Sequence, residues 1–285
     1  AGRKYERDSR NRGWSRGVSS RVKMIGQAYR NAQILSLDIV IGALILLRFF
    51  CAHLSVEVEW EVYALLAGTI WLIYTTDHLR DAEKASHSSR ERYHFHLKHR
   101  KILIGIALIV LILMIPLVLF VPIIITLAGG ILALLSILYL LIQHKLSTIF
   151  SKEIYVALVY TIGILMVPFL LSQHFRFDLF VSLFLLALVN LLIYSRYERA
   201  DDQLDGFSSI ATKMSKSSLE KIIVTLISIG IGMAILDLSV FSIFFLAGYT
   251  IYALIIFFPP IFEKGHLYRV VGDGVFLLPI LLEWV

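Results

Sequence analysis

Long apolar runs recur along the sequence and constrain the fold more than any other feature. Several reach the roughly 20 residues that a membrane-spanning helix requires. Hydrophobic residues make up 58% of the 285-residue chain, and its mean hydropathy is +0.78, more apolar surface than a soluble domain of this size can bury. The sequence therefore predicts an all-α, polytopic membrane protein. We expect nine transmembrane helices, at about 33–55, 58–76, 101–120, 122–142, 154–172, 178–196, 219–237, 239–258 and 268–285.

Lysine and arginine lie almost entirely on one side of this predicted topology. If the N-terminus is cytoplasmic, 25 of the 27 Lys and Arg residues fall in cytoplasmic segments, as the positive-inside rule requires. The net charge of +6 therefore reflects membrane topology, and we expect no nucleic-acid partner. We expect residues 1–24 to form a basic, disordered cytoplasmic tail and residues 25–285 to form the transmembrane domain. The cytoplasmic segments are 1–32, 77–101, 143–153, 196–221 and 259–269.

An acidic motif ends the second predicted span. Tyr74, Asp77 and Asp81 are spaced i, i+3 and i+7, so they share one helical face. Two carboxylates one turn apart can hold one Mg²⁺ and leave coordination positions for phosphate oxygens. We therefore predict that Asp77 and Asp81 are metal ligands.

A second acidic motif ends the sixth predicted span, on the same side of the membrane. Asn190, Tyr194, Glu198 and Asp202 recur every four residues and share one face, and Asp205 follows them. Like charges stacked in this way repel one another, so a cation is expected to neutralise them. We predict that Glu198 and Asp202 bind Mg²⁺. Asn190, inside the span, is expected to hydrogen-bond either a neighbouring helix or the substrate.

Together the two motifs predict a magnesium–diphosphate site on the cytoplasmic side. Mg²⁺ would neutralise the diphosphate and stabilise it as a leaving group, so the four carboxylates are also the predicted catalytic residues. A central apolar cavity in the helix bundle would hold an isoprenoid tail. Tyr74 and Tyr194 would line its mouth and stabilise an allylic cation. The other predicted substrate contacts are Arg80, Lys84, Asn190, Arg196, Arg199, Asp205 and Lys213.

The chain resembles the UbiA-type superfamily of intramembrane prenyltransferases over about residues 25–285. The resemblance rests on the nine-span layout, on Asp77-His-Leu-Arg-Asp81, and on Glu198-Arg-Ala-Asp-Asp202-Gln-Leu-Asp205-Gly206. It implies an all-helical enzyme that binds a prenyl diphosphate through Mg²⁺ and transfers the prenyl group to an acceptor. The expected acceptor is an aromatic compound or a lipid.

The motifs differ from the usual family pattern at three positions, and two other functions stay open. Ile73 and Tyr74 stand where the first motif commonly has Asn-Asp, and Glu198 stands where the second commonly begins with Asp. The superfamily also includes terpene cyclases, which use the same diphosphate site, so cyclisation is an alternative to transfer. A transporter is the third alternative. Transporters place their binding groups near the membrane midplane, whereas the acidic motifs here lie at its edge.

Three closely spaced histidines, His94, His96 and His99, precede the third predicted span. With His78 and His87 they resemble the histidine boxes of membrane di-iron hydroxylases, because clustered imidazoles can bind transition metals. The other four histidines are scattered over both sides of the membrane. We therefore favour a basic interfacial helix that caps the site and contacts anionic lipid headgroups.

Asp38 lies near the inner end of the first predicted span. An ionisable residue at that depth is functional by default, although an ion pair with Arg30 or with a loop cation would explain it equally well. The sequence offers no clear general base that could deprotonate an acceptor.

Overall fold

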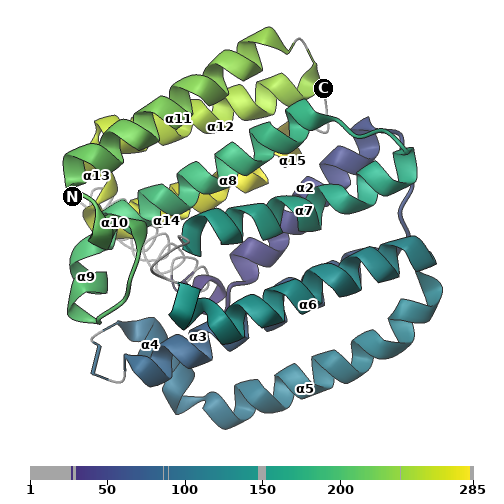
Figure 1. Cartoon of the computed structure of the whole chain (residues 1–285), viewed down its shortest axis with the longest axis horizontal. Helices are drawn as coiled ribbons and strands as arrows, with labels where there is room; N and C mark the ends of the chain where they lie inside the picture. Colours follow the sequence, from purple (N-terminus) through teal and green to yellow (C-terminus); the bar gives the residue numbers. More distant parts are fainter. Residues whose placement is uncertain are drawn as a thin grey trace, which may run out of the picture.

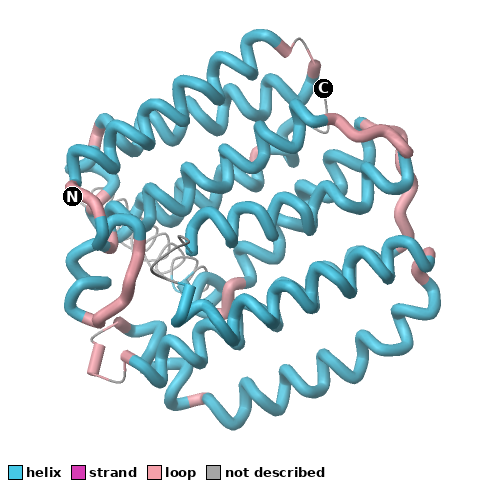
Figure 2. Tube along the Cα trace, in the orientation of Figure 1, coloured by secondary structure: helices cyan, strands magenta, loops and turns pink. Residues whose placement is uncertain are grey.

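The computed structural model describes residues 27, 30–85, 87–88, 90–146, 152–237 and 239–282. Every secondary-structure element in these ranges is helical (Figure 2), which confirms the predicted all-α fold. The predicted tail at 1–24 lies outside the described residues, as does the end of the ninth predicted span at 283–285.

Seven helical segments are long and apolar enough to cross a membrane, so the chain is a multi-pass membrane protein. The first two predicted spans correspond to α2 (Leu37–His53) and α3 (Trp60–Lys84), which are not among the seven. α2 has 17 residues, about 25 Å at 1.5 Å per residue, and the last turns of α3 are polar. The seven segments are Arg100–Phe120, Ile123–Ile142, Lys152–Ser172, Phe177–Tyr197, Lys216–Leu236, Val240–Phe257 and Lys264–Leu282.

The long helices lie side by side (Figure 1). α5 and α6 are on one side, α7 and α8 are in the middle, and α11 and α12 are on the opposite side. α8 packs against α7, α11 and α12, whereas α2 packs against α3 and α7. The bounds of these helices are α5 Arg100–Leu117, α6 Ile123–Leu146, α7 Lys152–Ser172, α8 Phe177–Tyr197, α11 Lys216–Leu236 and α12 Val240–Phe257.

Short helices gather at the end of the bundle where α3 and α8 finish. Figure 1 shows α4, α9 and α10 at this end, close to the start of α14. The two acidic motifs therefore lie at the same end of the molecule. The remaining elements are α4 Glu91–Lys98, α9 Arg199–Leu204, α10 Ile210–Lys213, α13 Pro259–Phe262, α14 Leu267–Gly274 and α15 Pro279–Leu282, with the 3-10 helices η1 Val118–Phe120, η2 Lys264–His266 and η3 Val275–Leu277.

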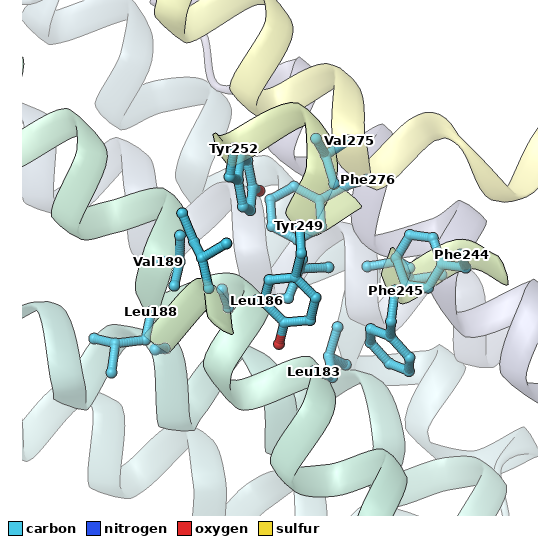
Figure 3. Packing of buried hydrophobic residues seen from close by; sticks show 14 of the residues in the cluster. Leu183, Leu186, Leu188, Val189, Phe244, Phe245, Tyr249, Tyr252, Val275 and Phe276 are labelled. Atoms are coloured by element: carbon cyan, nitrogen blue, oxygen red, sulfur yellow. The ribbon is translucent and has the colours of Figure 1, made fainter. Parts of the chain in front are cut away.

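Tyr249 of α12 lies in the tightly packed core around α8 (Figure 3). Its side chain is fully buried next to Leu183 and Leu186, and its hydroxyl donates to the Ser182 carbonyl oxygen at 2.9 Å. A Cβ atom at Gly230 of α11 would lie 2.2 Å from the ring. Only glycine allows α11 to approach the ring this closely. Because the Tyr249 hydroxyl also contacts α8, this packing fixes α8 against α11 and α12.

Helices α5 and α6 differ sharply from α8 in burial. Within an 18-residue stretch of each span, only 6% is buried in Arg100–Phe120 and 17% in Ile123–Ile142, compared with 56% in Phe177–Tyr197. The exposed side chains of α5 and α6 are mostly leucine and isoleucine. Surfaces of this kind face lipid in a membrane protein. α8 therefore carries the second acidic motif along the inside of the bundle.

Candidate active site

One cavity brings the two acidic motifs together. It has a volume of about 700 Å³, and its lining includes side chains of α2, α3, α6, α7, α8 and α14. Asp77 and Asp81 of α3 line it, and so do Glu198 and Asp202, which follow the end of α8. Two carboxylate pairs that are far apart in the sequence therefore face one space.

Much of the remaining lining forms an apolar wall. α3 contributes Leu66, Ile70 and Ile73, whereas α6 contributes Leu132 and α7 contributes Val156. The cavity thus combines an acidic end with an apolar wall formed by several helices. A ligand with one strongly anionic end and one hydrocarbon end matches this distribution, provided that cations lie between the anion and the carboxylates.

In the first motif, one lysine pairs with both carboxylates. Lys152, at the first position of α7, places its Nζ 2.8 Å from Asp77 Oδ2 and 3.6 Å from Asp81 Oδ2. The other oxygen of Asp77, Oδ1, is buried and has no hydrogen-bond partner among the described residues. Because an unsatisfied buried carboxylate oxygen is costly, this atom is a candidate ligand for a further cation.

In the second motif, two arginines pair with three carboxylates. Arg90, immediately before α4, has guanidinium nitrogens 2.8 Å from Asp202 Oδ1, 3.1 Å from Asp205 Oδ2 and 3.6 Å from Glu198 Oε2. Arg269 of α14 forms an ion pair with the other oxygen of Glu198. The planar guanidinium of Arg90 therefore links the segment before α4 to the end of α8 and to α9.

Burial and charge act differently on the two acids of the second motif. Burial raises the pKa of Glu198, but the positive charges of Arg269, Arg92 and Arg90 outweigh it, so this pKa lies below its ordinary value of 4.5. Burial also raises the pKa of Asp202, and the hydrogen bond from Arg90 offsets only part of the rise. Glu198 is therefore the more firmly ionised of the two.

Three predicted substrate contacts line the cavity. They are Tyr74, Asn190 and Tyr194. The Tyr194 hydroxyl donates to the Arg269 carbonyl oxygen at 3.1 Å, and Asn190 Nδ2 donates to Asp273 Oδ1 at 3.4 Å. Asn190 therefore makes the interhelical hydrogen bond that was one of its two predicted roles.

The predicted basic contacts lie elsewhere. Arg80 donates to the Leu140 carbonyl oxygen, and the buried Arg196 pairs with Glu220 at 2.7 Å. Asp205 is held by Arg90 and by Ser88, whose hydroxyl donates to it at 3.0 Å. The predicted contacts that the structure describes away from the cavity lining are Arg80, Lys84, Arg196, Arg199, Asp205 and Lys213.

Other cations take the place of these residues at the cavity. Lys152, Arg92 and Arg269 line it. In the sequence these residues resemble ordinary charges of cytoplasmic loops, and only the packing of α4, α7 and α14 brings them to the acidic motifs. The sequence offered one signal for them, which is their position. Arg92 lies in the predicted interfacial helix, and Lys152 and Arg269 lie close to the start of a predicted span.

Among the residues that the structure describes, the histidines do not form a metal cluster. His78 and His96 are buried with ring centroids 5.1 Å apart, whereas His87 and His94 are exposed. Burial lowers the pKa of His96, whose Nδ1 lies 2.8 Å from the Arg92 carbonyl oxygen. Within the described ranges, no group of three or more His, Cys, Asp or Glu side chains is arranged to hold a metal ion.

The carboxylate pairs nevertheless fit Mg²⁺ when a phosphate is present. Mg²⁺ is usually bound by one or two carboxylates together with water and substrate phosphates, not by an all-protein cage. Each motif offers two carboxylates one helical turn apart, and Asp77 Oδ1 is buried without a partner among the described residues. Mg²⁺ here would therefore share its coordination shell with a bound phosphate group.

Comparisons with protein-family models, with curated proteins and with solved structures gave no match for this chain. What the chain does is therefore inferred from the cavity, from the charges around it and from the motifs in the sequence.

Proposed function

We propose that the chain is a magnesium-dependent intramembrane prenyltransferase of the UbiA type. It ionises a prenyl diphosphate and transfers the prenyl group to an aromatic or lipid acceptor. The observation that carries this proposal is the single cavity that both carboxylate pairs line. In this proposal α2 and α3 also cross the membrane, which gives nine spans around a central cavity. The N-terminus and the acidic end of the cavity face the cytoplasm.

The acidic end binds the diphosphate. The two carboxylate pairs hold Mg²⁺, which supplies the positive charge that stabilises a leaving diphosphate. Lys152 lies between Asp77 and Asp81, so its ammonium group is within reach of phosphate oxygens bound there. Arg92 and Arg269 line the same region and add donors that suit phosphate geometry. Electrostatic stabilisation by these preorganised charges is the main catalytic contribution.

The apolar wall binds the prenyl chain. Leucine, isoleucine and valine side chains from α3, α6 and α7 form it, and burying the hydrocarbon against them supplies most of the binding energy. The ring of Tyr74 and that of Tyr194 line the cavity near the carboxylates. Their faces can stabilise the allylic cation that forms when the carbon–oxygen bond to diphosphate breaks.

The direct experiment is an assay of diphosphate release. Purified protein is incubated with Mg²⁺ and with prenyl diphosphates of several chain lengths, with and without aromatic and lipid acceptors, and the organic products are analysed. We expect Mg²⁺-dependent release together with a prenylated acceptor. A cyclic hydrocarbon or terpene alcohol formed without an acceptor would instead assign the chain as a cyclase.

The absence of release with every chain length and acceptor would contradict both enzyme assignments. Asp201→Asn provides a matched control, because Asp201 is exposed on α9 next to Asp202 but does not line the cavity. Its rate of diphosphate release should equal that of the unaltered protein.

A further inference from the structure

Two aspartates outside the acidic motifs form a second polar site in the cavity. Asp38 lies in the first turn of α2 and Asp273 lies near the end of α14, and both line the cavity. Their carboxyl groups are within hydrogen-bonding reach of each other. Arg30 does not neutralise Asp38, because its Nε is 2.9 Å from Glu91 Oε2.

Asn190 of α8 contacts one aspartate of this pair, Asp273, and also offers an open acceptor. Its Nδ2 donates to Asp273 Oδ1 at 3.4 Å. The residue is only 5% exposed, and its Oδ1 has no hydrogen-bond partner among the described residues. A Cβ atom at Gly272 would lie 2.8 Å from this oxygen, so glycine is needed for α14 to approach. A buried amide oxygen left unpaired beside the cavity indicates a place for a ligand that donates a hydrogen bond.

The aspartate pair lies deeper in the bundle than the diphosphate end. On α14, Arg269 precedes Asp273 by one helical turn, and Arg269 pairs with Glu198 of the second motif. On α8, Asn190 precedes Glu198 by eight residues, a rise of about 12 Å. The same two helices thus contact each other at the acidic end through Glu198 and further inside through Asn190 and Asp273. A prenyl diphosphate bound at the carboxylates would direct its reacting carbon toward this region.

Direct contact between two carboxyl groups favours one shared proton. Two ionised carboxylates at this distance repel strongly in a poorly solvated site, and one proton between them removes the repulsion. Arg269, which also pairs with Glu198, is the positive charge that faces the pair, and it favours a single remaining negative charge there. The titratable groups that face the pair from packed elements are Arg269 of α14, Tyr194 of α8, Tyr74 of α3, Tyr160 of α7 and Tyr252 of α12.

We propose that the Asp38–Asp273 pair is the proton acceptor of the reaction, an inference that rests on the proposed prenyl transfer. The carbon–oxygen bond of the prenyl diphosphate breaks, and its electron pair leaves with the diphosphate. The acceptor forms a new bond to the allylic carbon, while its hydrogen leaves as a proton to the ionised carboxylate of the pair. The electron pair of the broken bond to hydrogen stays with the acceptor. Prenyl diphosphate and acceptor thus give prenylated acceptor, diphosphate and one proton on the aspartate pair.

The first test compares Asp38→Asn and Asp273→Asn with the control Asp178→Asn, an exposed aspartate at the start of α8 that pairs with Arg176. We expect formation of the prenylated product to fall about 100-fold or more in both cavity variants. Mg²⁺-dependent binding of a prenyl thiolodiphosphate, which resists ionisation, should be unchanged. We also expect the unaltered protein to lose rate at low pH, where the pair becomes fully protonated, and both variants to lack this loss.

The outcomes separate this inference from the proposed function. If the unaltered protein releases no diphosphate, the proposed function is wrong and this role is wrong with it. If the unaltered protein forms product and both variants form it within about threefold of the same rate, the aspartate pair is not the proton acceptor, and the proposed function stands.

A second measurement needs no substituted protein that might fail to fold. Infrared spectra of the unaltered protein, labelled with ¹³C at the aspartate carboxyl groups, should show one protonated aspartate at neutral pH. Variants that fold should lose this band when either Asp38 or Asp273 is replaced by asparagine. A spectrum without a protonated aspartate at neutral pH would overturn the shared proton and, with it, the proposed role.

Discussion

The first acidic motif is paired with one lysine, whereas the second is paired with two arginines. At the first, the Lys152 ammonium group contacts Asp77 and Asp81. At the second, Arg90 and Arg269 occupy most of the oxygens of the acids around Glu198. A lysine is a single flexible point charge, while an arginine presents five donors in a fixed plane. The first motif is thus the more open to an added cation, and the second is the more rigid.

This difference assigns distinct tasks to the two ends of the site. The first motif keeps a buried carboxylate oxygen, Asp77 Oδ1, without a partner among the described residues. The second motif ties the segment before α4 to α8, α9 and α14 through its arginines. We therefore expect substitutions at the first motif to change cation binding most, and substitutions at the second to change stability as well.

The largest expected effect is on catalysis, and it should be shared by both motifs. Asp77→Asn and Asp202→Asn should each lower the rate of diphosphate release by on the order of 100-fold or more, because each removes charge that positions the diphosphate. The controls are Glu83→Gln and Asp201→Asn, which change exposed acids next to each motif. Full activity in Asp77→Asn or in Asp202→Asn would show that the substituted motif does not serve the reaction.

A smaller effect is expected on stability at the second motif. Arg90→Ala leaves three acids close together without the cation that bridges them, and all four side chains are at most 16% exposed. We expect a loss of about 1 to 3 kcal/mol in the free energy of unfolding, between the values for exposed and buried pairs.

Thermal unfolding in detergent measures this loss, with Arg100→Ala as the control. Arg100 pairs with Glu83 at the surface, where both side chains are about half exposed, so its removal should cost less than about 1 kcal/mol. Equal losses in the two variants would contradict the bridging role of Arg90.

A third effect is expected on cation binding at the first motif. Lys152→Gln removes the cation between Asp77 and Asp81, so Mg²⁺ should bind this pair more tightly in the absence of substrate, by roughly tenfold. The measurement is the Mg²⁺ dependence of the melting temperature. Lys84→Gln is the control. It changes an exposed lysine at the end of α3, the helix that carries Asp77 and Asp81, and should leave this dependence unchanged. If Lys152→Gln also leaves it unchanged, the lysine does not compete with Mg²⁺.

The smallest expected effect concerns pH. Because the pKa of Glu198 is lower in the folded protein than its ordinary value, its ionisation stabilises the fold above that value and this contribution is lost as the pH falls. The raised pKa of Asp202 has the opposite sign, since protonation at low pH relieves an unfavourable charge. Glu198→Gln should therefore reduce the fall in melting temperature between about pH 5 and pH 3, whereas Asp202→Asn should not. Identical pH profiles for both variants would contradict this assignment.

The sequence predicted the class of fold and the convergence of the two motifs for clear physical reasons. Apolar runs report membrane spans directly, and carboxylates every fourth residue at a helix end share one face. The four carboxylates do line one cavity. A basic helix before the third span was also predicted, and α4 lies there.

The partners of the charges could not be predicted in the same way. Hydropathy shows that a helix is buried or faces lipid, but it does not show which face of one helix meets another. Arg196 was predicted to contact substrate but pairs with Glu220, while Lys152 and Arg269 meet the acidic motifs instead. The contact of Asp38 with Asp273 depends on the packing of α14 against α2, which no local pattern encodes.

The central claim is that both acidic motifs bind one magnesium–diphosphate ligand in one cavity. Calorimetric titration with a prenyl thiolodiphosphate tests it without any chemical step. We predict binding that requires Mg²⁺ and that weakens at least about tenfold, or 1.4 kcal/mol, in Asp77→Asn and in Asp202→Asn alike. Binding that is independent of Mg²⁺, or that either substitution leaves unchanged, would contradict the claim.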